Sequence, residues 1–357
     1  MSGAETVAAV RELPSVSVIV LAFASRWLCF TKTSVAEPPA TRTRGLLHLS
    51  GCCDPEGGRA RVDFQSFSNS RLGIGLALAV SRAMPPALGY RIARSGARRL
   101  AADTDSYMTR SIRTNQWMAS GRTLEGAALD EAVRATLEMS GRFLYDIYHL
   151  PSNPQALLRR VAVTDVFERF LAETSKGPHV VVGVHLGNFD LVGQSLGISG
   201  WRAQVLSVAD PNGGYQWQNE MRARNGLEMT PVTIESLKRA ARRLADGGTV
   251  LTGIDRPLPG AELHPRFFGA PADVPVLHVR LAMRAQAPVI VISALQREDG
   301  LYELQASKPM MMSGSVKNQD DVVRNAETAL AVAEEFISRA PRQWAMPHAV
   351  WPDIQAP

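Results

Sequence analysis

Cysteine is scarce in this chain, which holds 3 among its 357 residues. Cys29, Cys52 and Cys53 all lie near the N-terminus, and their spacing fits neither a metal site nor a disulfide framework. The adjacent pair, Cys52 and Cys53, offers at most a strained bridge between neighbours. We therefore expect a protein of a reducing compartment, on the cytosolic side of any membrane.

Long hydrophobic runs are also missing. A membrane-spanning helix needs about 18 or more consecutive apolar residues, and the chain contains no such run. The nearest candidate, residues 16–30, is short and includes Arg26. It is either an interfacial segment or part of a poorly ordered extension. Residues 31–68 mix proline, glycine and serine without periodicity, so we expect residues 1–70 to form a poorly ordered extension.

Two further absences exclude or weaken whole classes of function. No Gly-x-Ser-x-Gly stretch lies at a strand-to-helix turn: residues 193–197 match the pattern inside the helix expected after residue 188, and residues 312–315 lack the strand-turn-helix setting of a serine esterase. Aromatic residues make up 6% of the chain, and residues 71–122 contain only Tyr90, Tyr107 and Trp117. A nucleic-acid-binding protein would interleave more aromatics with its basic residues. Nucleic-acid binding is therefore the weaker alternative, and we expect no such partner.

Residues 71–122 are rich in arginine. The arginines are Arg71, Arg82, Arg91, Arg94, Arg98, Arg99, Arg110, Arg113 and Arg122, against Asp103 and Asp105 alone. An apolar run at residues 72–80 precedes most of them, so the segment predicts hydrophobic and basic helices that associate with a membrane. An ordinary core helix with a solvated basic flank is the second interpretation.

The rest of the chain alternates strand and helix patterns. With 45% hydrophobic and 20% charged residues it can bury a large core. A β-branched run at residues 180–184 indicates a strand buried on both faces. Further strands are predicted at 203–208, 249–254 and 288–293, and helices at 124–149, 234–246, 274–284 and 322–339. This pattern predicts an α/β catalytic domain over residues 123–357, with a mostly parallel central sheet flanked by helices.

His185 follows the first of these strands directly. Catalytic groups collect at the carboxyl ends of parallel strands. Asn188 is a plausible N-cap of the next helix, so Asp190 falls in its first turn, where its carboxylate is expected to orient the imidazole. His185 then acts as a general base towards a hydroxyl, and the helix N-terminus faces the oxyanion. A loop histidine beside a capping aspartate is the alternative.

The context Val-His-x-Gly-Asn-Phe-Asp at residues 184–190 does not stand alone. With Gly-Ile-Asp-Arg at 253–256, Phe-Phe-Gly-Ala-Pro-Ala at 267–272 and Ala-Pro-Val-Ile-Val at 287–291, it resembles the bacterial lipid A late acyltransferases and phosphatidylinositol mannoside acyltransferases, which belong to the lysophospholipid, or glycerolipid, acyltransferase-like superfamily. The resemblance covers residues 71–352. Asp190 stands where many lipid A relatives carry glutamate, and the Asp-Arg pair looks closer to the mannoside branch.

The resemblance implies an O-acyltransferase of lipid biosynthesis. Its acyl donor would be a thioester of acyl carrier protein or coenzyme A, its acceptor a hydroxyl of a lipid or glycolipid, and it would need no metal or cofactor. It would lie on the cytoplasmic face of the plasma (inner) membrane, as a peripheral or monotopic protein with membrane lipids as partners. A catalytically silent relative is the alternative.

Residue roles follow from the same resemblance. His185 and Asp190 would be catalytic, and the substrate-binding residues would be Gly187, Asn188, Arg224, Asp255, Arg256, Phe267 and Phe268. Arg222 competes with Arg224 for contact with a phosphate or carrier headgroup. Phe267 and Phe268 would line the acyl pocket or else belong to a packed loop. Glu262 is a nearby acidic residue that we interpret as solvated.

Overall fold

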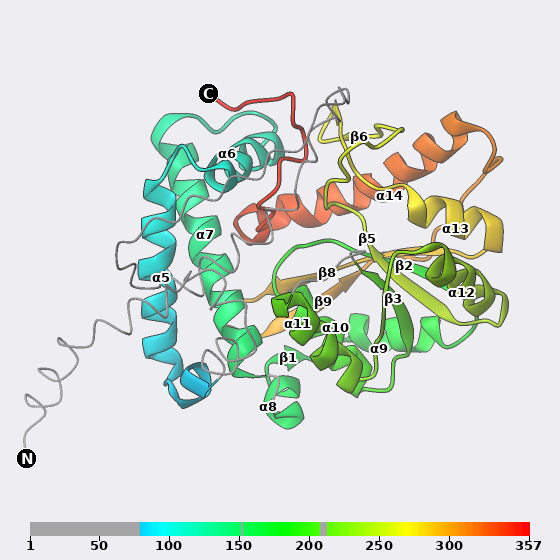
Figure 1. Ribbon diagram of the computed structural model, residues 1–357, viewed down its shortest axis with the longest axis horizontal. Helices are drawn as coiled ribbons and strands as arrows, with labels where there is room; N and C mark the ends of the chain where they lie inside the picture. The colour runs from blue at the N-terminus through cyan, green and yellow to red at the C-terminus, as the bar shows by residue number, and fades with distance from the viewer. Residues whose placement is uncertain (1–78, 151–152, 208–212) are drawn as a thin grey trace, which may run out of the picture.

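A seven-stranded sheet organises the computed structural model, which describes residues 79–150, 153–207 and 213–357 (Figure 1). Across the sheet the strands are β1 (Val161–Ala162), β9 (Tyr302–Ala306), β8 (Val289–Gln296), β2 (His179–Gly183), β5 (Thr249–Gly253), β3 (Ala203–Ser207) and β4 (Glu228–Pro231). Only β8 and β9 pair antiparallel among these neighbours; the other pairs are parallel. The expected mostly parallel α/β sheet is confirmed.

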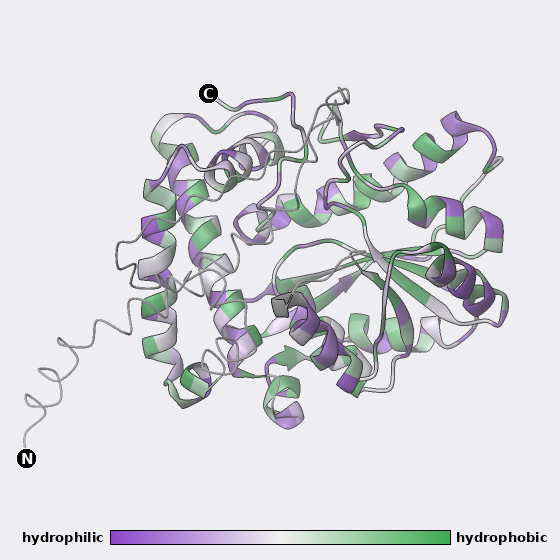
Figure 2. Cartoon of the chain, in the orientation of Figure 1, coloured by the Kyte–Doolittle hydropathy of each residue, from purple (hydrophilic) through white to green (hydrophobic). Residues whose placement is uncertain are grey.

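Helices cover both faces of this sheet. One side carries α9 (Asp165–Thr174) and α10 (Phe189–Ile198), and the other carries α12 (Ile234–Ala245), α13 (Leu277–Ala285) and α14 (Gln319–Arg339). In β2, Val180 and Val182 pack into the core on the side of α12, α13 and α14, whereas Val181 packs into the core on the side of α9 and α10. All three are fully buried. Burial on both faces explains why the strand is apolar without alternation, as Figure 2 shows for the central strands.

A layer of helices stands beside the sheet, formed by α5 (Pro86–Ala102), α6 (Tyr107–Ala119) and α7 (Gly126–His149). Two glycines allow α5 and α7 to approach: a Cβ on Gly89 would meet the Tyr145 ring at 2.2 Å, and one on Gly141 would meet the Ala93 carbonyl oxygen at 3.2 Å. Met118 of α6 belongs to the same core as β2 and α14. Through α6 the helical layer therefore joins one core of the sheet, while α5, α6 and α7 also share a smaller cluster of their own, which includes Ile112 and Leu137. The remaining elements are α8 (Pro154–Leu158), α11 (Gly213–Arg224), β6 (Arg266–Phe267), β7 (Ala270–Pro271) and the 3₁₀ turn η1 (Pro341–Gln343).

A buried carboxylate ties α7 to the sheet. Asp146 accepts hydrogen bonds from the hydroxyls of Tyr302, at 2.6 Å, and Tyr90, at 2.7 Å, and Arg160 lies 3.3 Å away. Burial, followed by the negative charge of Asp146, raises the pKa of Tyr90 to about 12 and that of Tyr302 further, so both phenols stay protonated donors. This network fixes α7, whose side chains form a wall of the site described below.

The membrane-associated helices expected within residues 71–122 are described only in part. The apolar run up to residue 78, like the extension at 1–70, lies outside the described residues. The basic stretch forms α5, whose arginines at 91, 94, 98 and 99 are exposed. Among the described helices, none combines the length and apolar character required to span a bilayer.

Candidate active site

His185 and Asp255 meet because their strands are neighbours in register. In the parallel pair β2–β5, Gly183 lies opposite Gly253. Each strand continues two residues to a polar side chain, so His185 and Asp255 leave the same edge of the sheet side by side. Nδ1 of His185 lies 2.6 Å from Oδ1 of Asp255. Gly253 leaves room for the imidazole, since a Cβ there would lie 3.1 Å from Cε1 of His185.

Asp255 is fully buried, and its carboxylate forms hydrogen bonds with His185 and Trp344. Its Oδ2 accepts from the backbone N–H of His185 at 2.9 Å and from Nε1 of Trp344 at 2.8 Å. Because a carboxylate only accepts hydrogen bonds, its contact with the imidazole places the proton on Nδ1. Nε2 of His185, on the opposite side of the ring, is left as an acceptor.

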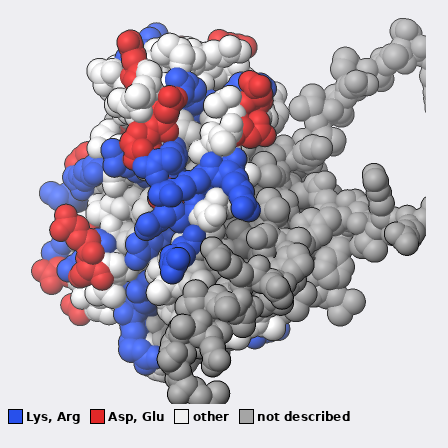
Figure 3. All heavy atoms as spheres, turned by 90° about the vertical axis from the view of Figure 1, so that its left-hand side faces the viewer, with Lys and Arg blue, Asp and Glu red and all other residues white. Residues whose placement is uncertain are grey.

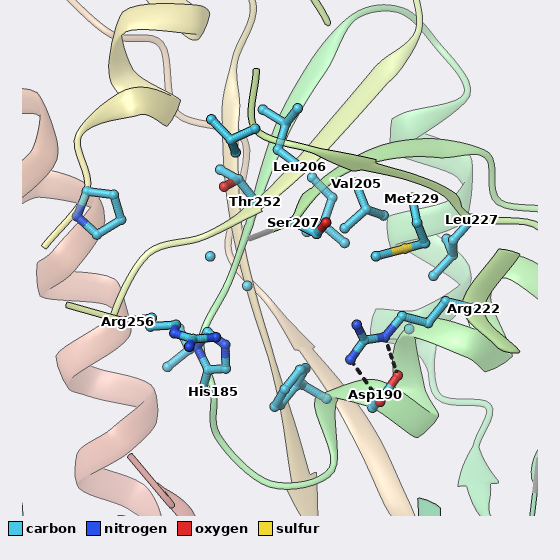
Figure 4. Close-up of a pocket in the computed structure, with 18 of the residues that line it drawn as sticks. His185, Asp190, Val205, Leu206, Ser207, Arg222, Leu227, Met229, Thr252 and Arg256 are labelled. Atoms are coloured by element: carbon cyan, nitrogen blue, oxygen red, sulfur yellow. Dashed lines mark hydrogen bonds and ion pairs between the residues drawn. The ribbon is translucent and has the colours of Figure 1, made fainter. Parts of the chain in front are cut away.

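Asp190 does not take the position expected from the sequence, because its carboxylate bonds Arg222 and not His185. Oδ1 lies 2.8 Å from Nε of Arg222, and Oδ2 lies 2.9 Å from Nη2. Gln194 adds a hydrogen bond to Oδ1 at 3.2 Å. Asp190 sits in the first turn of α10, and its side chain points towards α11, away from the imidazole (Figure 4). The partner that contacts His185 is Asp255.

Two pockets meet at His185. The larger, with a volume of about 280 Å³, has mainly apolar walls, which include Val205 and Leu206 of β3, Leu227 just before β4 and Met229 in β4 (Figure 4). Leu251 of β5 adds to them. The smaller, of about 140 Å³, lies between α7 and the C-terminal residues, with Phe143, Leu144, Ile147 and Met346 in its wall. Residues common to both are His185, Phe189, Asp190, Arg222 and Arg256. The imidazole is thus accessible from two separate cavities.

Positive charge and a second histidine flank the imidazole. Arg256 follows Asp255 and lines both pockets, next to His185 in Figure 4. His348 lines the smaller pocket. Its burial, together with the charges of Arg256 and His185, lowers its pKa to about 4. His348 is therefore neutral near pH 7 and offers the pocket an uncharged donor and acceptor. The ring of Phe189 lies edge-on to His185, with centroids 4.8 Å apart.

Gly187 and Asn188 lie in the smaller pocket, yet their closest contacts are with the protein itself. Gly187 has φ +61°, and a Cβ there would lie 2.4 Å from the carbonyl oxygen of Ala294 in β8. Asn188 is the N-cap of α10, as expected, since its side chain accepts from Leu191 N. Its Nδ2 also donates to the Phe143 carbonyl of α7. Both residues shape the loop that carries His185.

The remaining sequence candidates lie away from the described pockets. Arg224 is exposed at the end of α11 and lines neither pocket, whereas Arg222 lines both. Phe267 and Phe268 pack against Trp344 and Trp351 in the core instead of lining an acyl pocket. Glu262 is exposed, in agreement with a solvated residue.

A family model described as bacterial lipid A biosynthesis acyltransferase matches residues 65–352, which is most of the chain and includes the whole of this site. The chain belongs to this family. A search of curated proteins finds no match. The acyltransferase is thus an enzyme of lipid biosynthesis that transfers acyl groups to a lipid-like acceptor, in agreement with the resemblance of its motifs.

Sequence reasoning missed three contributors to the acyltransferase site. Phe189 lies inside the motif, but nothing in the sequence shows that its ring contacts the imidazole. His348 and Trp344 lie more than 150 positions from His185 in the chain, and they reach the site because residues 341–350 run beside the histidine loop. The usable signal was the position of Arg342-Gln343-Trp344 and Pro347-His348, which lie inside the range, residues 71–352, that the family resemblance covers.

Proposed function

We propose that the protein transfers a fatty acyl group from a thioester, carried by acyl carrier protein or coenzyme A, to a hydroxyl of a lipid or glycolipid. The observation that supports this most is the position of His185. Its Nδ1 is held by Asp255, and the ring stands where two mainly apolar cavities meet, one of which also has Gln218 and His348 in its wall. A transferase that joins two substrates needs its base at such a junction, so that neither substrate has to leave before the other arrives.

His185 would act as the general base. Nε2 takes the proton of the acceptor hydroxyl while the oxygen attacks the thioester carbonyl. The imidazolium that forms is stabilised by Asp255 and then gives its proton to the departing thiolate, so the histidine ends neutral. Arg256 and the N-terminus of α10 are the nearby positive groups that support the oxyanion. Asp190 would contribute by holding Arg222 in the wall shared by both pockets.

The larger pocket suits the acyl chain. Its walls are mainly aliphatic, and it lies against β3, β4 and the C-terminal end of β5. The smaller pocket combines an apolar wall from α7 with polar groups at Gln218, Arg256 and His348, and so suits the acceptor. Arg222 and Arg256 border both pockets and would bind phosphate or another anionic headgroup.

The helical layer would bind the membrane. Figure 3 shows a continuous band of basic side chains on the face where α5 lies. Arg91, Arg94 and Arg98 follow a helical spacing on α5 and are exposed, and Arg99 adjoins them. Arg94 and Arg98 share one acidic neighbour, Glu138. A surface with this excess of arginine would dock on anionic headgroups of the cytoplasmic leaflet as a peripheral protein.

The experiment is a transfer assay with a labelled acyl thioester, lipid extracts as acceptors, and the variant His185→Ala. We expect the variant to fold and to lose activity by a factor of about 10²–10⁴, because that is the usual contribution of a general base. His264→Ala is the matched control, since His264 also contacts an aspartate, Asp273, at 2.8 Å, but lies outside both pockets. Transfer by His185→Ala at the wild-type rate would refute the mechanism, and an inactive wild type would favour a catalytically silent protein.

A further inference from the structure

The C-terminal segment, residues 341–350, is tied to the loop that carries His185. Leu186 and Trp344 form an isolated antiparallel bridge, and the N–H of Gly187 donates to the carbonyl of Gln343 at 2.9 Å. The side-chain amide of Gln343 forms two hydrogen bonds with the backbone of Gln296. Its Oε1 accepts from the N–H at 2.7 Å, and its Nε2 donates to the carbonyl at 2.9 Å. The segment is therefore fixed to the end of β8 as well as to the histidine loop.

The indole of Trp344 extends this attachment to the carboxylate beside the histidine. Trp344 is fully buried, and its Nε1 donates to Oδ2 of Asp255 at 2.8 Å. The same oxygen accepts the backbone N–H of His185, while Oδ1 contacts Nδ1 of the imidazole. With donors on both oxygens, the Asp255 carboxylate is held in one rotation about its Cβ–Cγ bond.

This hydrogen bond is specific, because other tryptophans whose indole N–H is buried form none within the described part of the chain. The indole N–H groups of Trp117, Trp201 and Trp351 have no hydrogen-bond partner among the described residues. Trp351 is as buried as Trp344 and belongs to the same aromatic cluster. Burial of an indole in this fold thus does not by itself require a partner, and the partner of Trp344 is the one carboxylate that contacts His185.

The aromatic cluster keeps the indole in place. The ring of Phe267 stands edge-on to Trp344 with the centroids 5.9 Å apart, and the ring of Phe268 is tilted to it at 6.1 Å. Edge-on and tilted contacts of this kind favour one ring orientation over others. The Phe267-Phe268 turn therefore supports the indole, and through it the direction of the N–H.

We propose that Trp344 is a positioning residue of the acyl-transfer reaction, which acts through Asp255 to hold His185 in its reactive orientation and tautomer. The inference rests on the proposed general-base role of His185. Without the indole N–H, the Asp255 carboxylate loses one hydrogen-bond donor and rotates more freely about its Cβ–Cγ bond. Its hydrogen bond with the Nδ1 proton of the imidazole then becomes weaker. A larger fraction of His185 then carries its proton on Nε2, where it cannot accept one from the acceptor hydroxyl.

The test compares Trp344→Phe with Trp351→Phe in the full chain. Both changes remove an indole from the same cluster, but only the first removes a hydrogen bond to Asp255. We expect Trp344→Phe to lower kcat by about 10–100-fold, the usual effect of losing a group that orients a functional residue. KM for the thioester should stay near the wild-type value, because the pocket walls are intact. Trp351→Phe should retain wild-type kcat when corrected for folded protein.

A spectroscopic readout separates positioning from mere packing. In the wild type, the Nδ1 proton of His185 should give a downfield NMR resonance. It should weaken or disappear in Trp344→Phe and persist in Trp351→Phe. Equal kcat and equal resonances in the two variants would overturn the inference. If Trp344→Phe does not fold, benzothienylalanine at position 344, which replaces the N–H by sulfur and keeps the bicyclic shape, serves as the second variant.

The same measurements keep this inference apart from the proposed function. If the wild type transfers acyl groups and both phenylalanine variants match it, Trp344 has no positioning role while the function stands. If the wild type transfers none, the function fails. The Nδ1 resonance still decides whether Trp344 orders the pair of Asp255 and His185.

Discussion

The two carboxylates near His185 are expected to respond differently to the same chemical change, Asp to Asn. In Asp255→Asn the amide replaces a group that accepts three hydrogen bonds. Its single oxygen would turn towards the backbone N–H of His185 and the indole of Trp344, which are two fixed donors. The NH₂ group then faces Nδ1 of the imidazole and donates to it. This moves the ring proton to Nε2, so the base is blocked.

The magnitude follows from this change of tautomer. In serine proteases the equivalent Asp to Asn change, which also leaves the geometry intact, lowers kcat by about 10⁴-fold. That factor corresponds to about 5.5 kcal/mol of activation free energy, at about 1.4 kcal/mol for each power of ten. Because the amide keeps the size of the carboxylate and finds partners for the buried donors, we expect Asp255→Asn to remain folded.

Asp190→Asn should instead act mainly on stability. Arg222, whose side chain is 10% exposed, would lose its ion pair with Asp190 in a buried position. Breaking such a pair from one side costs about 3–5 kcal/mol. In a domain of this size the loss lowers Tm by on the order of 10 °C. Below the new Tm, the remaining activity should exceed that of Asp255→Asn, because the contact between His185 and Asp255 is untouched.

The assay measures thiol release from the acyl thioester at saturating acceptor, with Tm recorded for each protein. Correction for the folded fraction then gives kcat for both variants at one temperature. The reverse pattern would refute this assignment: Asp190→Asn with wild-type Tm and a 10⁴-fold loss, and Asp255→Asn nearly as active as the wild type. It would mean that Asp190 approaches His185 during the reaction.

The remaining predictions concern acid stability and membrane binding. Burial lowers the pKa of His278 to about 4, so the unfolded chain binds a proton that the fold does not, and stability falls by up to about 3 kcal/mol as the pH drops from about 6.5 to 4. In His278→Leu, urea unfolding at pH 7 and 4.5 should show a smaller difference than in the wild type, and an unchanged difference would contradict this origin. Replacing Arg91, Arg94 and Arg98 by glutamine should reduce sedimentation with anionic vesicles and leave neutral vesicles unaffected, whereas full binding by this variant would exclude α5 as the docking surface.

Much of the fold could be predicted because local sequence determines it. The β-branched residues at 180–184 are buried on both faces of the sheet, and the observed strand, β2, differs from the prediction by one residue at each end. The helix predicted at 234–246 ends where Gly247 adopts φ +83°, as a glycine stop requires. The antiparallel pairing of β8 with β9 could not be predicted, since the strand order is set by contacts between distant segments.

The same distinction explains the outcome for the site. His185 could be found because it follows its strand directly. Its partner, Asp255, could not be found in this way, because β3 and β4 come between β2 and β5 in the chain. No local feature of the sequence shows that β5 lies next to β2 in the sheet. Asp190 looked closer by sequence separation, but its place in the first turn of α10 directs it to Arg222. Arg224 is two residues from Arg222, which on a helix turns it to a different face.

The partners of the two carboxylates also decide which of them can assist proton transfer. Asp190 already faces a guanidinium, so the negative charge is largely neutralised and adds little attraction for an imidazolium. Asp255 is bonded to neutral donors, a backbone N–H and an indole, and the imidazole is the only group among its hydrogen-bond partners that gains a positive charge. Its charge is therefore available when His185 takes a proton. Burial makes this interaction stronger than it would be in water, so the electrostatics favour Asp255 for the same reason that the geometry does.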